Sequence, residues 1–141
     1  MNVEVNYVAV LVAGVAAMVV GFVWYGPMLF GKQWMKLMGY TKEGMEAAKK
    51  EMGKTYSISF VLSLVSAYVL SHVMTMSMGA YNYSAVMTGL TSAFWMWLGF
   101  VMPVQATDVL FGGKKFKLLA INTGYQLASL LVMGVVLGLM K

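Results

Sequence analysis

Four long runs of apolar residues without Asp, Glu, Lys or Arg fix what this chain can fold into. They cover residues 5–30, 55–79, 83–107 and 118–140. Each run reaches the roughly 20 residues that a helix needs to cross the hydrocarbon core of a bilayer. A single charge at the centre of a span costs about 2.5–3.5 kcal/mol on insertion scales. We therefore predict an all-α integral membrane protein, with four transmembrane helices in a single domain over residues 1–141.

The composition excludes several classes of protein. Hydrophobic residues make up 60 % of the chain and charged residues 11 %, against about 45–50 % and about 25 % in soluble domains. The absence of cysteine excludes disulfides, cysteine zinc sites and iron–sulfur ligation. Ten lysines and no arginine give a net charge of +5, but they form no basic stripe with interleaved aromatics, so we expect no nucleic-acid partner. We also expect no cofactor and no metal site.

The lysines predict an orientation in the membrane. Two connections carry nine of the ten, and the connection at residues 80–82 carries none. The positive-inside rule places the basic connections in the cytoplasm, so both termini are expected outside the cell membrane. Anionic lipid headgroups are the expected partners of these side chains. The connection over residues 31–54 holds Lys32, Lys36, Lys42, Lys49, Lys50 and Lys54, and the connection over residues 108–117 holds Lys114, Lys115 and Lys117.

The first basic connection also has helical signals. Thr41 is a candidate N-cap and Gly53 a candidate stop. Between them, apolar residues at helical spacing predict a short cytoplasmic amphipathic helix near the headgroups, and Trp34 would help to anchor it. Two interpretations remain open, a solvated connector that favours anionic lipids and a docking surface for a cytoplasmic partner.

Two segments resemble each other and suggest a duplication. Residues 21–37 and 99–119 each contain Gly-Phe-Val, then Pro, then Leu-Phe-Gly, and then a Lys, an aromatic residue and another Lys in that order. We interpret them as parts of two helical hairpins with the same orientation, a parallel internal repeat, with chance similarity as the alternative. Pro27 and Pro103 would each kink or end a helix at its interfacial turn. Alternatively, Pro103 would open its helix and expose the Gly99 carbonyl.

Small residues recur every four positions on the first and fourth runs. Such rows let membrane helices approach closely, either within one chain or between subunits. We expect at least one row to face a second protomer, and hence a homo-oligomer. The rows comprise Ala9, Ala13, Ala17 and Gly21, then Ala120, Gly124 and Ala128, followed by the pair Gly134 and Gly138.

Polar side chains within the spans are the candidate site. Asn122 and Gln126 share one face of the fourth run, Gln105 closes the third run, and His72 lies in the outer half of the second. Such groups either pair with one another and with serines of the second run, or line a polar path between helices. Asp108 is expected to cap its helix or to pair with Lys114 or Lys115.

The templates of common enzymes are absent, so we expect no catalysis. The leading functional hypothesis is a small transporter-like or channel-like protein with a polar, uncharged site between the second and fourth helices. The alternative is a structural or accessory subunit of a larger membrane complex, with a membrane-protein partner.

Residues 21–27, Gly-Phe-Val-Trp-Tyr-Gly-Pro, and the later Phe30-Gly31-Lys32 and Trp34 resemble the N-terminal signature of a family of small prokaryotic membrane proteins. This family is known as domain of unknown function 1761. Leu110-Phe111-Gly112 and residues 121–125, Ile-Asn-Thr-Gly-Tyr, resemble its second half. The resemblance covers nearly the whole chain and implies a four-helix integral membrane protein. It implies no activity.

Overall fold

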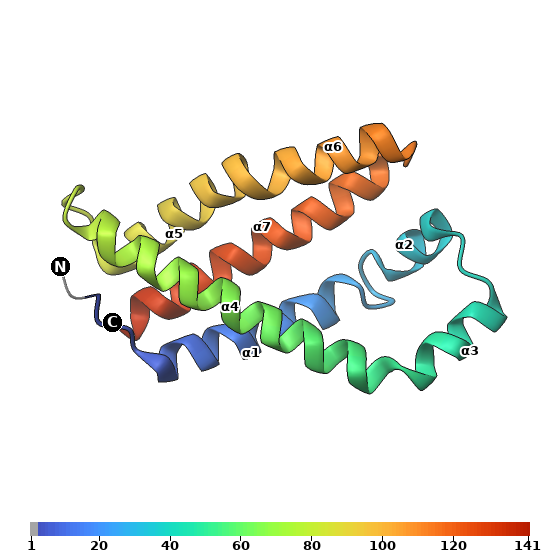
Figure 1. Cartoon of the computed structure of the whole chain (residues 1–141), viewed down its shortest axis with the longest axis horizontal. Helices are drawn as coiled ribbons and strands as arrows, with labels where there is room; N and C mark the ends of the chain where they lie inside the picture. Colours follow the sequence, from blue (N-terminus) through green and yellow to red (C-terminus); the bar gives the residue numbers. More distant parts are fainter. Residues whose placement is uncertain (1–2) are drawn as a thin grey trace.

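The computed structural model describes residues 3–141, which form a bundle of helices with a helical extension at one end (Figure 1). Four helices are long and apolar enough to cross a membrane, as predicted. They are α1 (Tyr7–Trp24), α4 (Met52–Met78), the continuous helix over Ala85–Gly112, and α7 (Phe116–Leu139). The third comprises α5 (Ala85–Met96), the π-helical turn η1 (Trp97–Val101) and α6 (Met102–Gly112).

The helix α7 holds the bundle together, because it lies between α1 and α5–α6 and packs against both (Figure 1). The remaining long helix, α4, packs against α1 and α5. Small residues make these contacts possible: Ala13, Ala67 and Ala93 are fully buried. Gly89 and Gly134 bring α5 and α7 into backbone contact, since a Cβ atom at Gly134 would lie 2.5 Å from the Gly89 carbonyl oxygen.

The small-residue rows thus pack helices within the chain. Ala9, Ala13 and Ala17 are buried, and Gly21 lies against the Tyr125 ring. A Cβ atom at Gly138 would meet the backbone of α5. Gly124 faces the Trp24 ring, whereas Ala120 at the start of its row is exposed. A neighbouring helix of the same chain covers the buried residues of these rows, and the contact with a second protomer stays a prediction.

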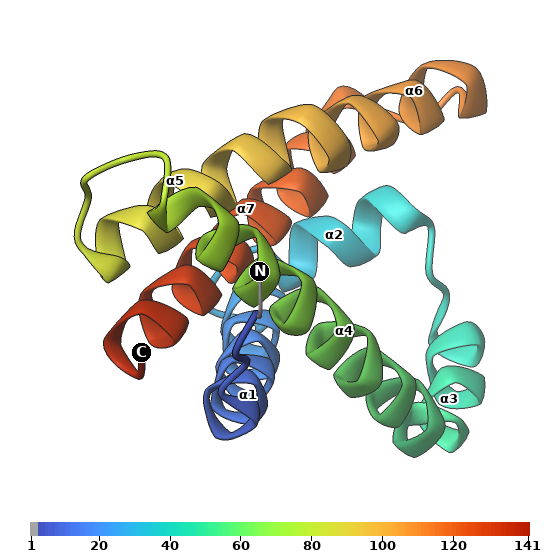
Figure 2. The same ribbon diagram turned by 60° about the vertical axis from the view of Figure 1, so that its left-hand side comes forward.

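One end of the bundle, which we call the lysine-rich end, carries both basic connections. Two short helices, α2 (Gly31–Met38) and α3 (Lys42–Lys50), extend beyond the spans there (Figure 2). Gly39, with φ of +71°, ends α2, and the Thr41 side chain caps α3 by accepting from the Gly44 N–H. Gly53 does not stop α3, because α3 ends at Lys50 and Gly53 lies in the first turn of α4. The sequence did not predict α2 as a helix.

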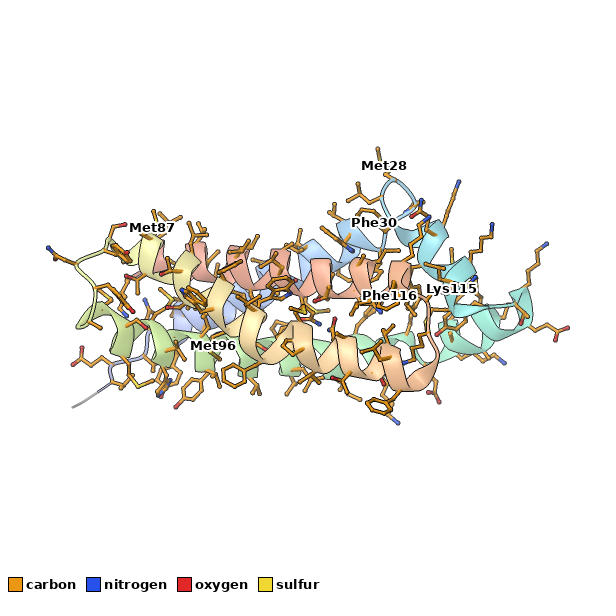
Figure 3. All side chains as sticks on the ribbon, turned by 90° about the horizontal axis from the view of Figure 1, so that it is seen from above. Met28, Phe30, Met87, Met96, Lys115 and Phe116 are labelled. Carbon is orange, nitrogen blue, oxygen red and sulfur yellow. The ribbon has the colours of Figure 1, made fainter. Side chains whose placement is uncertain are left out.

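The two prolines behave differently. After α1 ends at Trp24, Pro27 lies in a closed turn whose Met28 extends away from the bundle (Figure 3). Pro103, by contrast, does not end its helix, which continues to Gly112. The π turn η1 precedes Pro103, and its wider winding accommodates a residue without an N–H. The third span therefore passes position 107, and the second basic connection shortens to three residues, Gly113–Lys115, between α6 and α7.

Polar contacts finish both ends of the bundle. At the lysine-rich end, Lys114 Nζ lies 2.6 Å from Asp108 Oδ2, the ion pair expected for Asp108. Both side chains are well exposed, so the pair adds little stability. At the opposite end, the Asn6 amide donates to the Met140 carbonyl and Lys141 donates to Thr75 Oγ1. Partial burial lowers the pKa of Lys141 from its ordinary value.

Candidate functional site

Three consecutive residues of α7 receive hydrogen bonds from the aromatic side chains around them. The Trp24 indole N–H donates to the Ile121 carbonyl at 3.0 Å, and the Tyr25 hydroxyl donates to Asn122 Oδ1 at 2.7 Å. From the other side, the Trp97 indole N–H donates to the Thr123 carbonyl at 2.8 Å. We call residues 121–123 the α7 polar layer. It accepts hydrogen bonds from tryptophan and tyrosine donors that would otherwise be buried without a partner.

The aromatic rings form a wall that leads from this layer toward the lysine-rich end. The Tyr25 ring meets Tyr125 edge-on at a centroid distance of 5.2 Å, and on its other side meets Trp34 at 5.4 Å. Trp34 in turn lies 5.5 Å from Tyr40. Gly21 makes room for Tyr125, whose hydroxyl would lie 3.2 Å from a Cβ atom at Gly21. Residues far apart in sequence thus converge here.

This aromatic wall borders a cavity of about 690 Å³ at the lysine-rich end, which we call the inner cavity. Its volume is within the range of about 300–1,000 Å³ that is typical of ligand pockets. Three spans and the α2–α3 extension supply the lining, so the cavity exists only because the extension folds back beside the bundle. The lining comprises Met18, Gly21, Phe22, Tyr25, Gly31, Trp34, Met35, Tyr40, Met45, Ala48, Lys49, Glu51, Met52, Thr55, Tyr56, Ser59 and Tyr125.

Most of this lining is apolar or aromatic, and its polar groups are hydroxyls. Within residues 3–141, the hydroxyls of Thr55, Tyr56, Ser59 and Tyr125 have no hydrogen-bond partner within 3.5 Å in the protein. The two charged lining residues, Lys49 and Glu51, lie together at the junction of α3 and α4. Chemically, the inner cavity can hold an apolar body and donate hydrogen bonds to acceptors on it.

The four residues of the sequence-predicted polar site do not come together. None of them lines the inner cavity. Asn122 belongs to the polar layer, whereas Ser71, the neighbour of His72, lines a cavity at the opposite end with Leu137. Leu137 lies fifteen residues beyond Asn122 on α7, or about 22 Å at 1.5 Å per residue.

His72 and the two glutamines have other surroundings. The His72 ring lies 4.4 Å from the Tyr68 ring, and its Nδ1 is 3.1 Å from the Tyr68 carbonyl. Gln105 on α6 buries its side-chain oxygen, which has no protein hydrogen-bond partner among residues 3–141. Gln126 follows Tyr125 on α7 and is partly buried. The serines of α4 do not pair with these groups: Ser63 bonds the carbonyl of Ser59 one turn before it.

Sequence reasoning missed the residues that build the inner cavity. Tyr25 and Tyr125 entered only as parts of the two segments that resemble the family, and Tyr56 drew no argument. One usable signal existed, because Tyr25 and Tyr125 lie in the two family-like segments and these segments contact each other. In the described part of the chain, no group of three or more His, Asp or Glu side chains is placed to hold a metal ion.

Comparisons with known proteins give a family and no nearer relative. No curated protein and no solved structure matches the chain. The profile of one family, described as a protein of unknown function (DUF1761), matches residues 8–138. That range contains both contacting segments, residues 21–27 and 121–125, and all of the four candidate spans except the first residue of the first and the last residue of the fourth. The chain therefore belongs to the DUF1761 family.

Proposed function

We propose that this protein is a transporter-like membrane protein that binds an amphiphilic organic molecule in the inner cavity. The observation that carries the proposal is the cavity itself, an open pocket of about 690 Å³ lined by α1, α4, α7 and the α2–α3 extension. Ser59 of α4 and Tyr125 of α7 face it together. The polar site expected between the second and fourth spans is therefore proposed here, with hydroxyls in place of amides and with Lys49 and Glu51 at one end.

The arrangement along the bundle favours a carrier over an open channel. A second cavity, of about 340 Å³, lies at the opposite end and is lined by Glu4, Asn6, Ser71 and Lys141 among apolar residues. Between the two ends, Ala13, Ala67 and Leu70 belong to a packed core and are at most 2 % exposed. A hydrated path through such packing would require the helices to move. Cavities at both ends with a closed middle suit alternating access.

A binding role is proposed in preference to catalysis. The lining hydroxyls of the described chain have no hydrogen bond to a histidine or a carboxylate, the groups that activate a hydroxyl nucleophile. Aromatic rings and methionines otherwise dominate the lining, and such side chains bind apolar molecules through area and shape.

We further propose that the lysine-rich end is cytoplasmic, that both termini are outside, and that the membrane is the cell membrane. The lysines of α2, α3 and the Gly113–Lys115 connection all gather at this end, where nitrogen-tipped side chains surround α2 and α3 (Figure 3). α3 would then lie near the headgroups. The variant Tyr81→Cys tests this orientation, because it places a single cysteine in the connection expected outside. An impermeant thiol reagent is expected to label it in intact cells, and labelling only in broken cells would contradict the orientation.

Native mass spectrometry after gentle extraction tests the binding role. The wild-type protein is expected to retain one small-molecule adduct per chain, because the inner cavity offers a pocket-sized apolar and aromatic lining. Ser59→Phe places a ring in the cavity and is expected to remove the adduct. Ser66→Phe is the matched control, since Ser66 is an exposed serine on the same helix.

Three outcomes would contradict the binding role. One is a wild-type particle without an adduct, and another is an adduct that survives Ser59→Phe. A wild-type particle that contains a different protein and no adduct would favour the accessory-subunit alternative. The same spectrum reports whether the chain forms the expected homo-oligomer.

A further inference from the structure

The charges of the inner cavity lie at one end of it. Lys49 and Glu51 lie at the α3–α4 junction, and no other lining residue is charged. Among the described residues the ion pair is that of Lys114 and Asp108, so Lys49 and Glu51 have no ionic partner. The surrounding segment, residues 31–54, holds six lysines and three glutamates. Its electrostatic field therefore favours an anion at the cavity mouth.

Hydrogen-bond donors continue from this charged end along one face of α4. Met52, Thr55, Tyr56 and Ser59 follow the i, i+3, i+4, i+7 spacing of a single helix face, and all four line the cavity. From Met52 to Ser59 the helix rises about 10 Å. The hydroxyls on this face thus form a row that starts beside the charged end and leads toward the membrane interior.

The α1 side of the cavity is apolar and adjoins this row. Met18 and Phe22 line it, and the Phe22 ring meets the Tyr56 ring edge-on at a centroid distance of 5.2 Å. Phe22 is also 54 % exposed on the outer surface of the bundle. In a chain whose four long helices are apolar enough to cross a membrane, an exposed side chain of α1 faces lipid. The cavity therefore has a charged end, a middle with hydroxyl donors, and an apolar side next to lipid.

We infer that the occupant is an anionic glycerophospholipid with a hydroxylated headgroup, of the phosphatidylglycerol type. Its headgroup, ester region and acyl chain follow the same order as the charged, hydroxyl and apolar parts of the cavity. Its phosphate accepts from the Lys49 ammonium, and a headgroup hydroxyl donates to the Glu51 carboxylate. Its ester carbonyls accept from the hydroxyl row of α4, and one acyl chain packs against Met18 and Phe22. The inference rests on the proposed function, since it names the ligand of the same cavity.

A competition experiment tests the headgroup. Delipidated protein in detergent is given equal amounts of phosphatidylglycerol, phosphatidylethanolamine and phosphatidylcholine with identical chains, and native mass spectrometry measures the bound fraction of each. The wild type is expected to favour phosphatidylglycerol over phosphatidylcholine about fivefold, because one exposed lysine beside the phosphate adds a modest attraction for a net negative headgroup.

Charge variants locate this preference. Lys49→Glu is expected to abolish the preference for phosphatidylglycerol, and Lys49→Gln to leave an intermediate preference. Both variants remove the ammonium group that donates to the phosphate. Lys50→Glu makes the same charge change on the next residue, which is exposed like Lys49 but does not line the cavity, and is expected to keep most of the preference. An equal loss in both glutamate variants would overturn the inference, because it would show attraction to the surface as a whole.

Further competition measurements identify the source of the anion, and they separate the proposed binding function from the assignment of the headgroup. Excess inorganic phosphate or palmitate is expected not to displace phosphatidylglycerol, and displacement by either would overturn a phospholipid ligand. Equal binding of the three lipids, or a preference for phosphatidylethanolamine, would overturn the headgroup assignment. If the three lipids bind equally to the wild type but Ser59→Phe binds none of them, the proposed function stands without this inference. Absence of every adduct would overturn both.

Discussion

Gly134→Leu is expected to prevent the bundle from assembling. α5 and α7 touch through backbone atoms at this point, where a Cβ atom at Gly134 would lie 2.5 Å from the carbonyl oxygen of Gly89. Overpacking a well-packed site costs about 1–3 kcal/mol, occasionally more. The obstacle here is backbone, which no side-chain rotation moves, so we expect the upper end of that range, about 3 kcal/mol or more. In mild detergent, the variant should elute in the void volume on size exclusion or melt far below the wild type.

Gly99→Leu is the matched control for this variant. Gly99 lies in η1 of the third span, the span that Gly134 contacts, is exposed, and has no atom within 4 Å of a Cβ added to it. We expect Gly99→Leu to elute and melt close to the wild type. A Gly134→Leu protein that is as stable as Gly99→Leu would show that α5 and α7 do not pack through Gly89 and Gly134.

Trp24→Ala is expected to give the second largest loss of stability. The Trp24 indole donates to the Ile121 carbonyl, and its ring packs against Gly124 and lies 4.9 Å from the Phe30 ring. Truncating a packed tryptophan costs about 3–5 kcal/mol. For a chain of this size that is a fall in melting temperature of roughly 10 °C or more. Because Trp24 also orients the turn that carries Tyr25, retention of the cavity ligand should fall with stability.

The control for this variant is Trp95→Ala, which removes a tryptophan of the third span that is 66 % exposed. Its indole has no hydrogen bond to the protein within the described residues. We expect a change in melting temperature of only a few degrees, because an exposed side chain leaves no cavity when it is truncated. Equal losses in the two variants would contradict the role of Trp24 in joining α1 to α7.

The spans were predictable because their signal is local. Residues 5–30 and 55–79 contain α1 and most of α4, since each run is too long and too free of charge to do anything else. The ion pair of Asp108 and the N-cap at Thr41 were predictable for the same reason, as both join residues close in sequence. The end of the third helix was not, because the charge-free run stops before Asp108 whereas the helix continues past it to Gly112.

The site was harder to predict because distant segments build it. A polar residue in a span has few local constraints, so the sequence does not show that Asn122 pairs with Tyr25 while His72 lies near the opposite end. The inner cavity depends on where α2 and α3 fold back, and Gly39 was the available marker of that reversal. Resemblance in two separated segments was the better guide, because Tyr25 and Tyr125 lie in them and contact each other.

Photolabelling tests most directly whether the inner cavity is the binding site. A phosphatidylglycerol analogue with a diazirine on its acyl chain is incorporated into membranes that contain the protein, and the labelled peptides are mapped after irradiation. We expect the label to be concentrated on Met18 and Phe22 of α1 and on Tyr56 of α4. Labelling that simply follows exposure to lipid, as strong at Val61 and Val65 as at Met18, would contradict it.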